Sequence, residues 1–306
     1  MAEALLERDA QLEILVGAVA QAAQGNGSTA LVAGEAGIGK TSLVRALIER
    51  LGDEARVLTA ACDDLVASRT LGPLHDAAIG STGPLAAALA DEAPVDRVFA
   101  ALLEELAEER PTVLVVEDVH WADDATLDVL GYAARRIEGV GAILVLTTRD
   151  ELDPRHPLHR LLGALTGCPV HRIELSPLSR DAVQALASGT GRDPATVYAL
   201  TRGNPFFVTE TLAAPHGQVP ASVKDAVLAR LRGLDADCRE ALERLSVVPS
   251  HSWRTAAGDS GASATRWTGQ PESTPRKRLS GWRASTSSSR NVRTSTAPTS
   301  SIRRAA

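Results

Sequence analysis

The stretch Gly34-Glu35-Ala36-Gly37-Ile38-Gly39-Lys40-Thr41 fits the pattern G-x-x-x-x-G-K-[ST] at every fixed position. Glycines tolerate positive φ angles, so such a loop can turn successive N–H groups inward at an anion. A helix expected to begin near Lys40 would direct the positive end of its dipole at the same point. The Lys40 ammonium could reach the outer phosphates of a nucleotide, and the Thr41 hydroxyl could ligate Mg²⁺. The stretch predicts a phosphate-binding loop, with a chance match in a glycine-rich turn as the alternative.

Short apolar runs alternate with helical patterns on both sides of this stretch, as a phosphate-binding loop requires. Continuous β-branched and aliphatic runs predict strands over 28–33, 57–60, 112–116 and 142–147. Apolar spacing predicts helices over 3–23, 40–51 and about 123–136, with mostly helix over 63–110. Strands that alternate with helices form βαβ units. The expected fold class is therefore α/β, with a parallel sheet flanked by helices.

Two carboxylates, Glu117 and Asp118, follow the strand predicted over 112–116. At the carboxyl end of a parallel strand they would face the crevice where ligands bind in open α/β sheets. One could hold Mg²⁺, and the other could orient or deprotonate an attacking water. Two acids that merely face solvent are the alternative, which the upstream phosphate-binding loop disfavours. Which acid takes which role stays open, because glutamate precedes aspartate here.

Arg149 ends the next predicted strand and is a third candidate. A cation at that edge of the sheet could sense the γ-phosphate and its loss. The alternative is a surface arginine paired with Asp150 or Glu151.

The remainder of the chain changes character twice. After about residue 175, helices are expected over 179–188, 194–201, 205–213, 221–232 and 236–247. Residues 250–306 are rich in Ser, Thr and Arg and hold three aliphatic side chains beyond alanine. Such a segment cannot bury enough surface to offset its chain entropy. It is therefore expected to be a disordered tail.

Charge and targeting signals favour a cytoplasmic protein. The net charge is −6, yet residues 250–306 carry ten Lys/Arg against two acids, so the first 249 residues are strongly acidic. An acidic body argues against a large nucleic-acid footprint there. No export signal and no membrane-length apolar run is seen. The odd number of cysteines, without a C-x-x-C pair, fits a reducing compartment: Cys62, Cys168 and Cys238.

Taken together, these motifs resemble the ATPase module of the large ATP-binding LuxR-type bacterial regulators. Those regulators belong to the STAND class of AAA-like P-loop NTPases. The resemblance runs in order from about residue 5 to residue 249. It rests on these stretches: Leu6-Glu7-Arg8-Asp9, Gly34 to Ser42, Cys62-Asp63-Asp64, Leu71-Gly72-Pro73-Leu74-His75-Asp76, Val116-Glu117-Asp118-Val119-His120-Trp121-Ala122-Asp123, Thr147-Thr148-Arg149, Leu175-Ser176-Pro177-Leu178 and Gly203-Asn204-Pro205-Phe206.

The resemblance implies roles for particular residues. Residues 34–42, Ser42 included, would bind ATP or ADP. Arg8 would lie near the base and ribose, and Pro205 would contact the nucleotide from a helical lid. Glu117 and Asp118 would be the Walker B pair and, with Thr41, the Mg²⁺ site. Arg149 would be the sensor. Such modules usually act as slow Mg²⁺-dependent ATPases that switch a regulator between closed and assembly-competent forms.

The domains expected from the resemblance are an ATPase domain (1–175), a helical lid (176–217) and the truncated start of a winged helix (218–249). No DNA-binding helix-turn-helix follows within these residues. The tail (250–306) holds three of the four tryptophans among Ser, Thr and Arg. An off-frame translation of a GC-rich gene would explain it, and a genuine basic tail is the alternative. Alternative functions are a P-loop phosphotransferase or an inert nucleotide-binding fragment.

Overall fold

The computed structural model describes residues 5–64, 69–108, 110–150, 152–215, 220–232 and 237–239. The chain divides into two compact units, residues 1–236 and residues 237–306. The tail expected over 250–306 lies outside the described residues, as does most of the helix expected over 236–247. Among the described residues, no helix combines the length and the apolarity that crossing a membrane requires.

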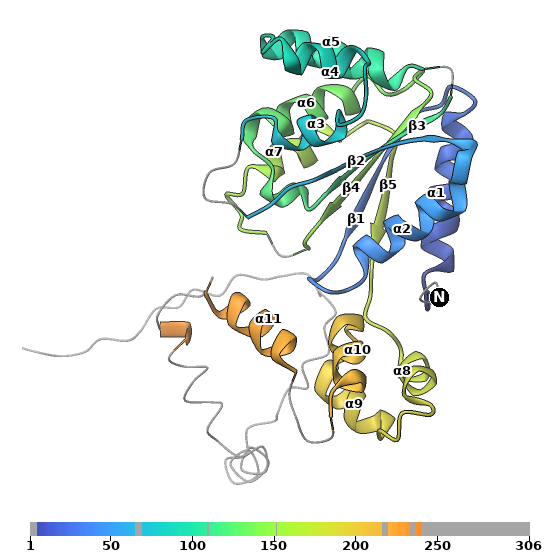
Figure 1. Cartoon of the computed structure of the whole chain (residues 1–306), viewed down its shortest axis with the longest axis vertical. Helices are drawn as coiled ribbons and strands as arrows, with labels where there is room; N and C mark the ends of the chain where they lie inside the picture. Colours follow the sequence, from blue (N-terminus) through green and yellow to red (C-terminus); the bar gives the residue numbers. More distant parts are fainter. Residues whose placement is uncertain are drawn as a thin grey trace, which may run out of the picture. The chain divides into compact units, whose positions relative to one another are not determined.

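Five parallel strands form one sheet in the order β2-β3-β4-β1-β5 (Figure 1). They are β1 (Ser28–Ala33), β2 (Arg56–Ala61), β3 (Thr112–Glu117), β4 (Ala142–Thr148) and β5 (Val170–Glu174). The first four confirm the strands predicted from apolar runs. The apolar runs do not predict β5, because three of the five residues in Val-His-Arg-Ile-Glu are polar. An edge strand is covered less completely than a central one, so its pattern is weaker.

Helices cover both faces of the sheet (Figure 1). α1 (Asp9–Ala22) and α2 (Lys40–Leu51) lie on one face, and α3 to α7 lie on the other. Within β3, Val113 and Val115 pack towards α1 and α2, whereas Leu114 and Val116 pack towards the other layer. Both faces are apolar because both are covered. The second layer comprises α3 (Gly72–Ala77), α4 (Pro84–Ala90), α5 (Val95–Leu106), α6 (Asp124–Ala134) and α7 (Leu158–Ala164).

The first helix is shorter than predicted: it begins at Asp9, not at residue 3. Glu7 has φ of 56°, which is incompatible with helix, so residues 5–8 form an irregular segment, here called the strap. Leu5 of the strap packs against the α1–α2 side of the core. Leu6 packs against the helices that follow β5. Tertiary contacts therefore override an apolar spacing that reads as helix.

The helices after β5 are α8 (Arg180–Ala187), α9 (Pro194–Thr201) and α10 (Pro205–Ala213), here called the lid after the role that the resemblance predicts. They match the helices predicted over 179–188, 194–201 and 205–213 within one residue. Side chains of Ser179 and Asp193 cap the first two by accepting hydrogen bonds from main-chain N–H groups. A small core of its own holds the lid together, with Val183 and Val208 fully buried. α11 (Ala221–Arg232) follows, as predicted.

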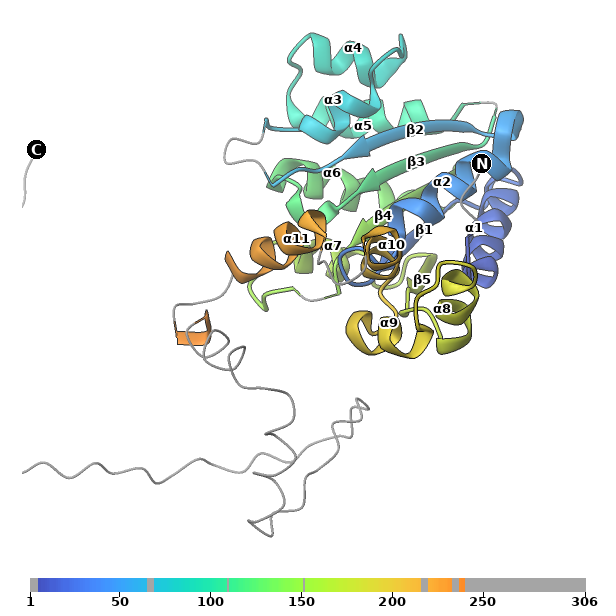
Figure 2. The same ribbon diagram turned by 60° about the horizontal axis from the view of Figure 1, so that its bottom comes forward.

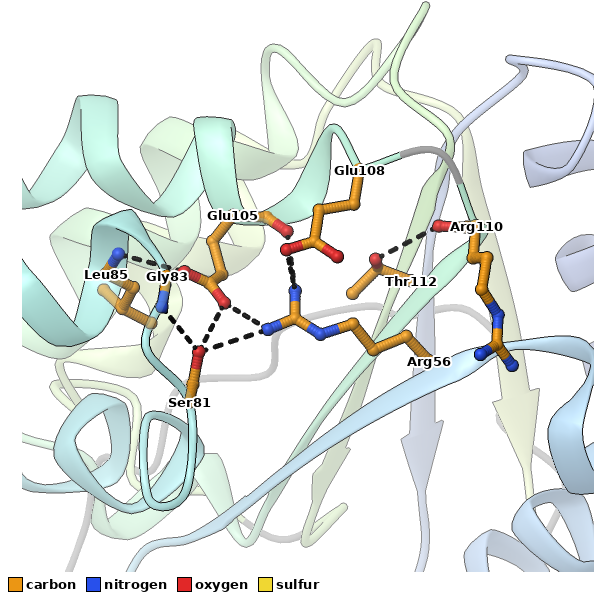
Figure 3. A network of polar contacts seen from close by, with 8 residues as sticks. All are labelled: Arg56, Ser81, Gly83, Leu85, Glu105, Glu108, Arg110 and Thr112. Carbon is orange, nitrogen blue, oxygen red and sulfur yellow. Dashed lines mark hydrogen bonds and ion pairs between the residues drawn. The ribbon is translucent and has the colours of Figure 1, made fainter.

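A buried carboxylate joins the edge strand β2 to the helices of the second layer (Figure 3). The Glu105 side chain is 1% exposed and forms an ion pair with Arg56. It also accepts hydrogen bonds from the Ser81 hydroxyl at 2.9 Å and from the Leu85 N–H at 3.0 Å. Burial by itself raises the pKa of Glu105, but these hydrogen bonds outweigh it and leave the pKa below its usual value.

Replacing Glu105 by alanine is expected to lower the free energy of unfolding by about 3 kcal/mol, because a buried pair loses one partner. Because the folded-state pKa is depressed, this contribution is present above the unfolded-state pKa and is lost as the pH falls below about 4. Urea denaturation of both proteins across that range measures it. Glu108, 46% exposed and 3.0 Å from Arg56, provides the matched control. Glu108→Ala should cost under about 1 kcal/mol, and equal losses in the two variants would contradict the assignment.

Candidate nucleotide-binding site

The predicted phosphate-binding loop connects β1 to α2, as its mechanism requires. Gly37 and Gly39 have φ of 78° and 100°, angles that side-chain-bearing residues rarely adopt. Lys40 is 8% exposed, and its ammonium donates to the carbonyls of Gly34 at 2.8 Å and Glu35 at 3.1 Å. Burial lowers the pKa of Lys40, whereas the nearby carboxylates, foremost Asp118, oppose this shift. The ammonium is thus held inside the curve of the loop.

The two strand-end acids lie beside the loop and have different surroundings. The Thr41 hydroxyl donates a hydrogen bond to the carboxylate of Glu117. Asp118 adopts a left-handed conformation, with φ of 53°, and its N–H donates to the Thr147 hydroxyl at 2.8 Å. Hydroxyl and carboxylate oxygens are the protein ligands that Mg²⁺ prefers. The pair formed by Thr41 and Glu117 therefore has the chemistry of a Mg²⁺ site.

Arg149 lies at the end of β4, and its guanidinium faces the Trp121 ring, 5.5 Å from the centroid. Trp121 in turn packs against His120, whose ring is 5% exposed. Burial, followed by the positive charges of Arg149, Lys40 and His156, lowers the pKa of His120 to about 4. The neutral His120 imidazole thus lies near Asp118, with its Nδ1 3.8 Å from the Asp118 carboxylate.

A cavity of about 430 Å³ lies between the loop, the strap and the lid. Its polar end is lined by loop residues, Asp118 and Arg149, and its apolar end by strap and lid side chains. The lining includes these predicted site residues: Arg8, Ala36, Gly37, Ile38, Gly39, Lys40, Thr41, Ser42, Asp118, Arg149 and Pro205. Gly34, Glu35 and Glu117 are not in the lining. A polar end joined to an apolar end matches the phosphates and the base of a nucleotide.

Sequence reasoning missed part of this cavity. Leu5 and Leu6 of the strap, and Leu186 of α8, line the apolar end. Ordinary apolar periodicity assigns such leucines to a core. Leu6 stands in the stretch Leu6-Glu7-Arg8-Asp9, but the resemblance gave a role there to Arg8 alone, and Leu5 and Leu186 lie in no motif. Glu7 is also involved, because its carboxylate accepts hydrogen bonds from the N–H and the hydroxyl of Ser179, the residue that caps α8. The strap therefore contacts both the core and the lid.

Arg8 is buried and engages the main chain. Its guanidinium donates to the carbonyl of Ser176 at 2.6 Å, to that of Ile38 at 3.3 Å and to that of Glu7 at 3.1 Å. Burial lowers the pKa of Arg8, and the carboxylate of Glu7 counteracts it. Arg8 thus ties the phosphate-binding loop to the start of the lid, while it also lines the cavity.

The comparisons agree with this fold. Residues 4–146 match the family model described as the AAA ATPase domain. A curated relative, an uncharacterised protein of Rhizobium meliloti (strain 1021), is 30% identical over 54% of this chain. The match covers 22% of that relative, so this chain spans less than a quarter of its length.

Two solved structures illustrate the likeness. A Walker-type ATPase of Pyrococcus abyssi superposes with a TM-score of 0.51 at 13% identity, covering 78% of this chain and 76% of that one. A STAND protein with a tetratricopeptide-repeat sensor from Pyrococcus horikoshii gives 0.49 at 18% identity, covering 80% and 35%. The five-stranded parallel sheet flanked by helices is the P-loop NTPase fold, with an AAA ATPase pattern over residues 4–146.

Proposed function

We propose that this chain binds ATP with Mg²⁺, hydrolyses it slowly, and serves as the signal-transduction switch of a LuxR-type transcriptional regulator. The observation that carries the nucleotide-binding part is the hydrogen bond between Thr41 and Glu117 beside a cavity whose polar end is the phosphate-binding loop. AAA ATPase domains generally use ATP and Mg²⁺, which agrees with this chemistry. The regulator part rests on the ordered motif stretches that resemble such proteins, from Arg8 to Pro205.

The phosphate end of the cavity fits a triphosphate. Two loop glycines with positive φ turn the main chain, the Lys40 ammonium lies within the curve, and the N-terminus of α2 begins there. Together they supply an ammonium, main-chain N–H groups and a helix dipole to one anion. Arg149, which also lines the cavity, adds a second positive charge there. The apolar end, lined by Leu5, Leu186 and Pro205, suits a purine base.

The metal site divides the work between the two acids. Glu117 and Thr41 would hold Mg²⁺, which when bound neutralises charge developing on the phosphates. Asp118 would orient or deprotonate a water in the cavity, a role that its position in the lining and its 46% exposed side chain support. Arg149, opposite it, would stabilise negative charge on the outermost phosphate.

The switch itself would be the lid, because the cavity lining reaches its helix α10 at Pro205, Phe206 and Thr209. A nucleotide changes the equilibrium between two lid positions only to the extent that it binds one of them more tightly. The strap and the lid line the same cavity as Asp118 and Arg149. A triphosphate would reach these two charged side chains with a phosphate that a diphosphate lacks. ATP binding would therefore change which lid surfaces are available for self-assembly or for a partner.

Calorimetry of the purified chain with ATP and ADP, in Mg²⁺ and in EDTA, tests the proposal. We expect binding of both nucleotides, an affinity for ATP that EDTA weakens at least tenfold, and slow release of phosphate. Light scattering should then show assembly with ATP and not with ADP. Absence of ATP binding would overturn the proposal altogether. Phosphate transfer to a small acceptor, found in a screen of acceptors, would replace the switch by a phosphotransferase.

A further inference from the structure

Every carbonyl of the phosphate-binding loop from residue 34 to residue 39 accepts a hydrogen bond, but the donors come from different parts of the chain. Lys40 serves the first two carbonyls, those of Gly34 and Glu35. The main-chain N–H of Leu43, within α2, serves the last, that of Gly39. The three carbonyls between them, at positions 36, 37 and 38, depend on donors from outside the loop.

Two of these outside donors belong to the lid. The Asn204 amide donates to the Ala36 carbonyl at 3.1 Å, across 168 residues of sequence. The Phe206 N–H donates to the Gly37 carbonyl at 3.1 Å. The third donor is the Arg8 guanidinium of the strap, 3.3 Å from the Ile38 carbonyl. Both views of the fold place α10 directly beside the loop between β1 and α2 (Figures 1 and 2).

A trans peptide unit links these contacts to the phosphate site. Its carbonyl and the N–H of the next residue point in opposite directions. A donor that holds the Ala36 carbonyl outward therefore aims the Gly37 N–H inward, and Arg8 on Ile38 does the same for the Gly39 N–H. Among the described residues, neither of these N–H groups donates to a main-chain carbonyl. Inward N–H groups are what a phosphate-binding loop offers its ligand.

The glycine at position 37 independently supports a close contact between the loop and the lid. It occupies one of the four variable positions of the loop pattern, so the motif alone does not demand glycine there. A Cβ at position 37 would lie 2.7 Å from the Cβ of Phe206 and 3.1 Å from Oδ1 of Asn204. Asn204 is 3% exposed, and its Oδ1 has no hydrogen-bond partner within the part of the chain that the structure describes. The close approach of the lid, together with a φ of 78°, accounts for the glycine.

We propose that Asn204 is a positioning residue of the nucleotide site: from the lid, it orients the loop N–H groups that bind phosphate. Arg8, from the strap, orients the Gly39 N–H through the Ile38 carbonyl. Phosphate affinity therefore depends on the lid through the loop itself, separately from any contact between the lid and the base. This inference rests on the proposed ATP binding and specifies which groups outside the loop set its phosphate affinity.

The test compares Kd values for ATP and for inorganic tripolyphosphate, which has no base, by calorimetry. Asn204→Ala should weaken both about tenfold, the effect of losing one net hydrogen bond of about 1.4 kcal/mol. Asn204→Asp keeps the side-chain volume but turns a carboxylate towards the Ala36 carbonyl and the Glu35 side chain, and should weaken both at least as much. If Asn204→Ala does not fold, Asn204→Asp alone tests the proposal.

Asp193→Ala is the matched control. Asp193 caps α9 by accepting from the Thr196 N–H at 3.0 Å, so its loss loosens the lid without touching the loop. We expect less than a twofold change in either Kd. Hydrogen exchange at Gly37, whose N–H the Asn204 contact directs inward, should be altered in the Asn204 variants and not in this control.

The outcomes separate the two proposals. Wild-type protein that fails to bind ATP refutes the proposed function. Wild-type protein that binds ATP, with Asn204 variants of equal affinity, refutes the positioning role. A loss confined to ATP, with tripolyphosphate unchanged, would assign Asn204 to the base and also overturn the inference. So would an equal loss in Asp193→Ala, because lid stability alone would then explain the result.

Discussion

Lys40→Ala is expected to weaken ATP binding at least 100-fold. The ammonium is nearly buried and lies inside the phosphate-binding loop, where each charge-assisted hydrogen bond to a phosphate contributes about 1.5–3 kcal/mol. Two such bonds correspond to a factor of about 100 or more in affinity. Calorimetry with ATP in Mg²⁺ measures the loss directly.

The matched control for this variant is Lys224→Ala. Lys224 is exposed on α11 and carries the same charge, so its removal tests the effect of net charge alone. We expect its affinity for ATP to stay within twofold of wild type. If Lys40→Ala bound ATP as tightly as Lys224→Ala does, the loop would not be the phosphate site. Circular dichroism of both variants checks that a change in affinity does not reflect unfolding.

The second large effect separates the two acids. Asp118→Asn should retain ATP affinity within about threefold and slow hydrolysis at least 100-fold, because positioned general bases contribute about 10²–10⁴-fold. Glu117→Gln should weaken ATP binding in Mg²⁺ to the level seen in EDTA, because the carboxylate that the Thr41 hydroxyl contacts would be lost as a metal ligand.

The two variants should thus lose different properties: Asp118→Asn loses hydrolysis, and Glu117→Gln loses Mg²⁺-dependent binding. Titrations in Mg²⁺ and in EDTA report on the metal ligand, and single-turnover phosphate release reports on the water-positioning group. Finding the Mg²⁺ dependence lost in Asp118→Asn and kept in Glu117→Gln would reverse the assignment. Unchanged binding and hydrolysis in both variants would remove these acids from the site. Asp128→Asn, an exposed carboxylate on α6, serves as the control.

Local sequence determined the framework of this protein. Four of the five strands follow from apolar runs of four to six residues. Three of them, β1, β3 and β4, are central strands, which are buried on both faces and need no polar alternation. The loop between β1 and α2 follows from glycines and one lysine at fixed spacing, since the backbone conformation there depends on those residues themselves. The helix predicted from about residue 123 begins at Asp124, and the carboxylate of Asp123 caps it by accepting from the Thr126 N–H at 3.1 Å. The boundaries predicted between the ATPase domain, the lid and a winged-helix start remain predictions.

Only the tertiary structure showed which residues, distant in the sequence, contact the phosphate-binding loop. The strap reads as helix from its leucines, yet Glu7 and Arg8 leave the helical path to reach Ser179 and the loop carbonyl of Ile38. Asn204 stands in the stretch Gly203-Asn204-Pro205-Phe206, in which the resemblance gave a role to Pro205 alone, and its partner Ala36 is 168 residues away. Periodicity and turn propensity describe what a residue does with its near neighbours. Hydrogen bonds between distant segments depend on how the sheet and the lid pack, and no spacing along the chain encodes them.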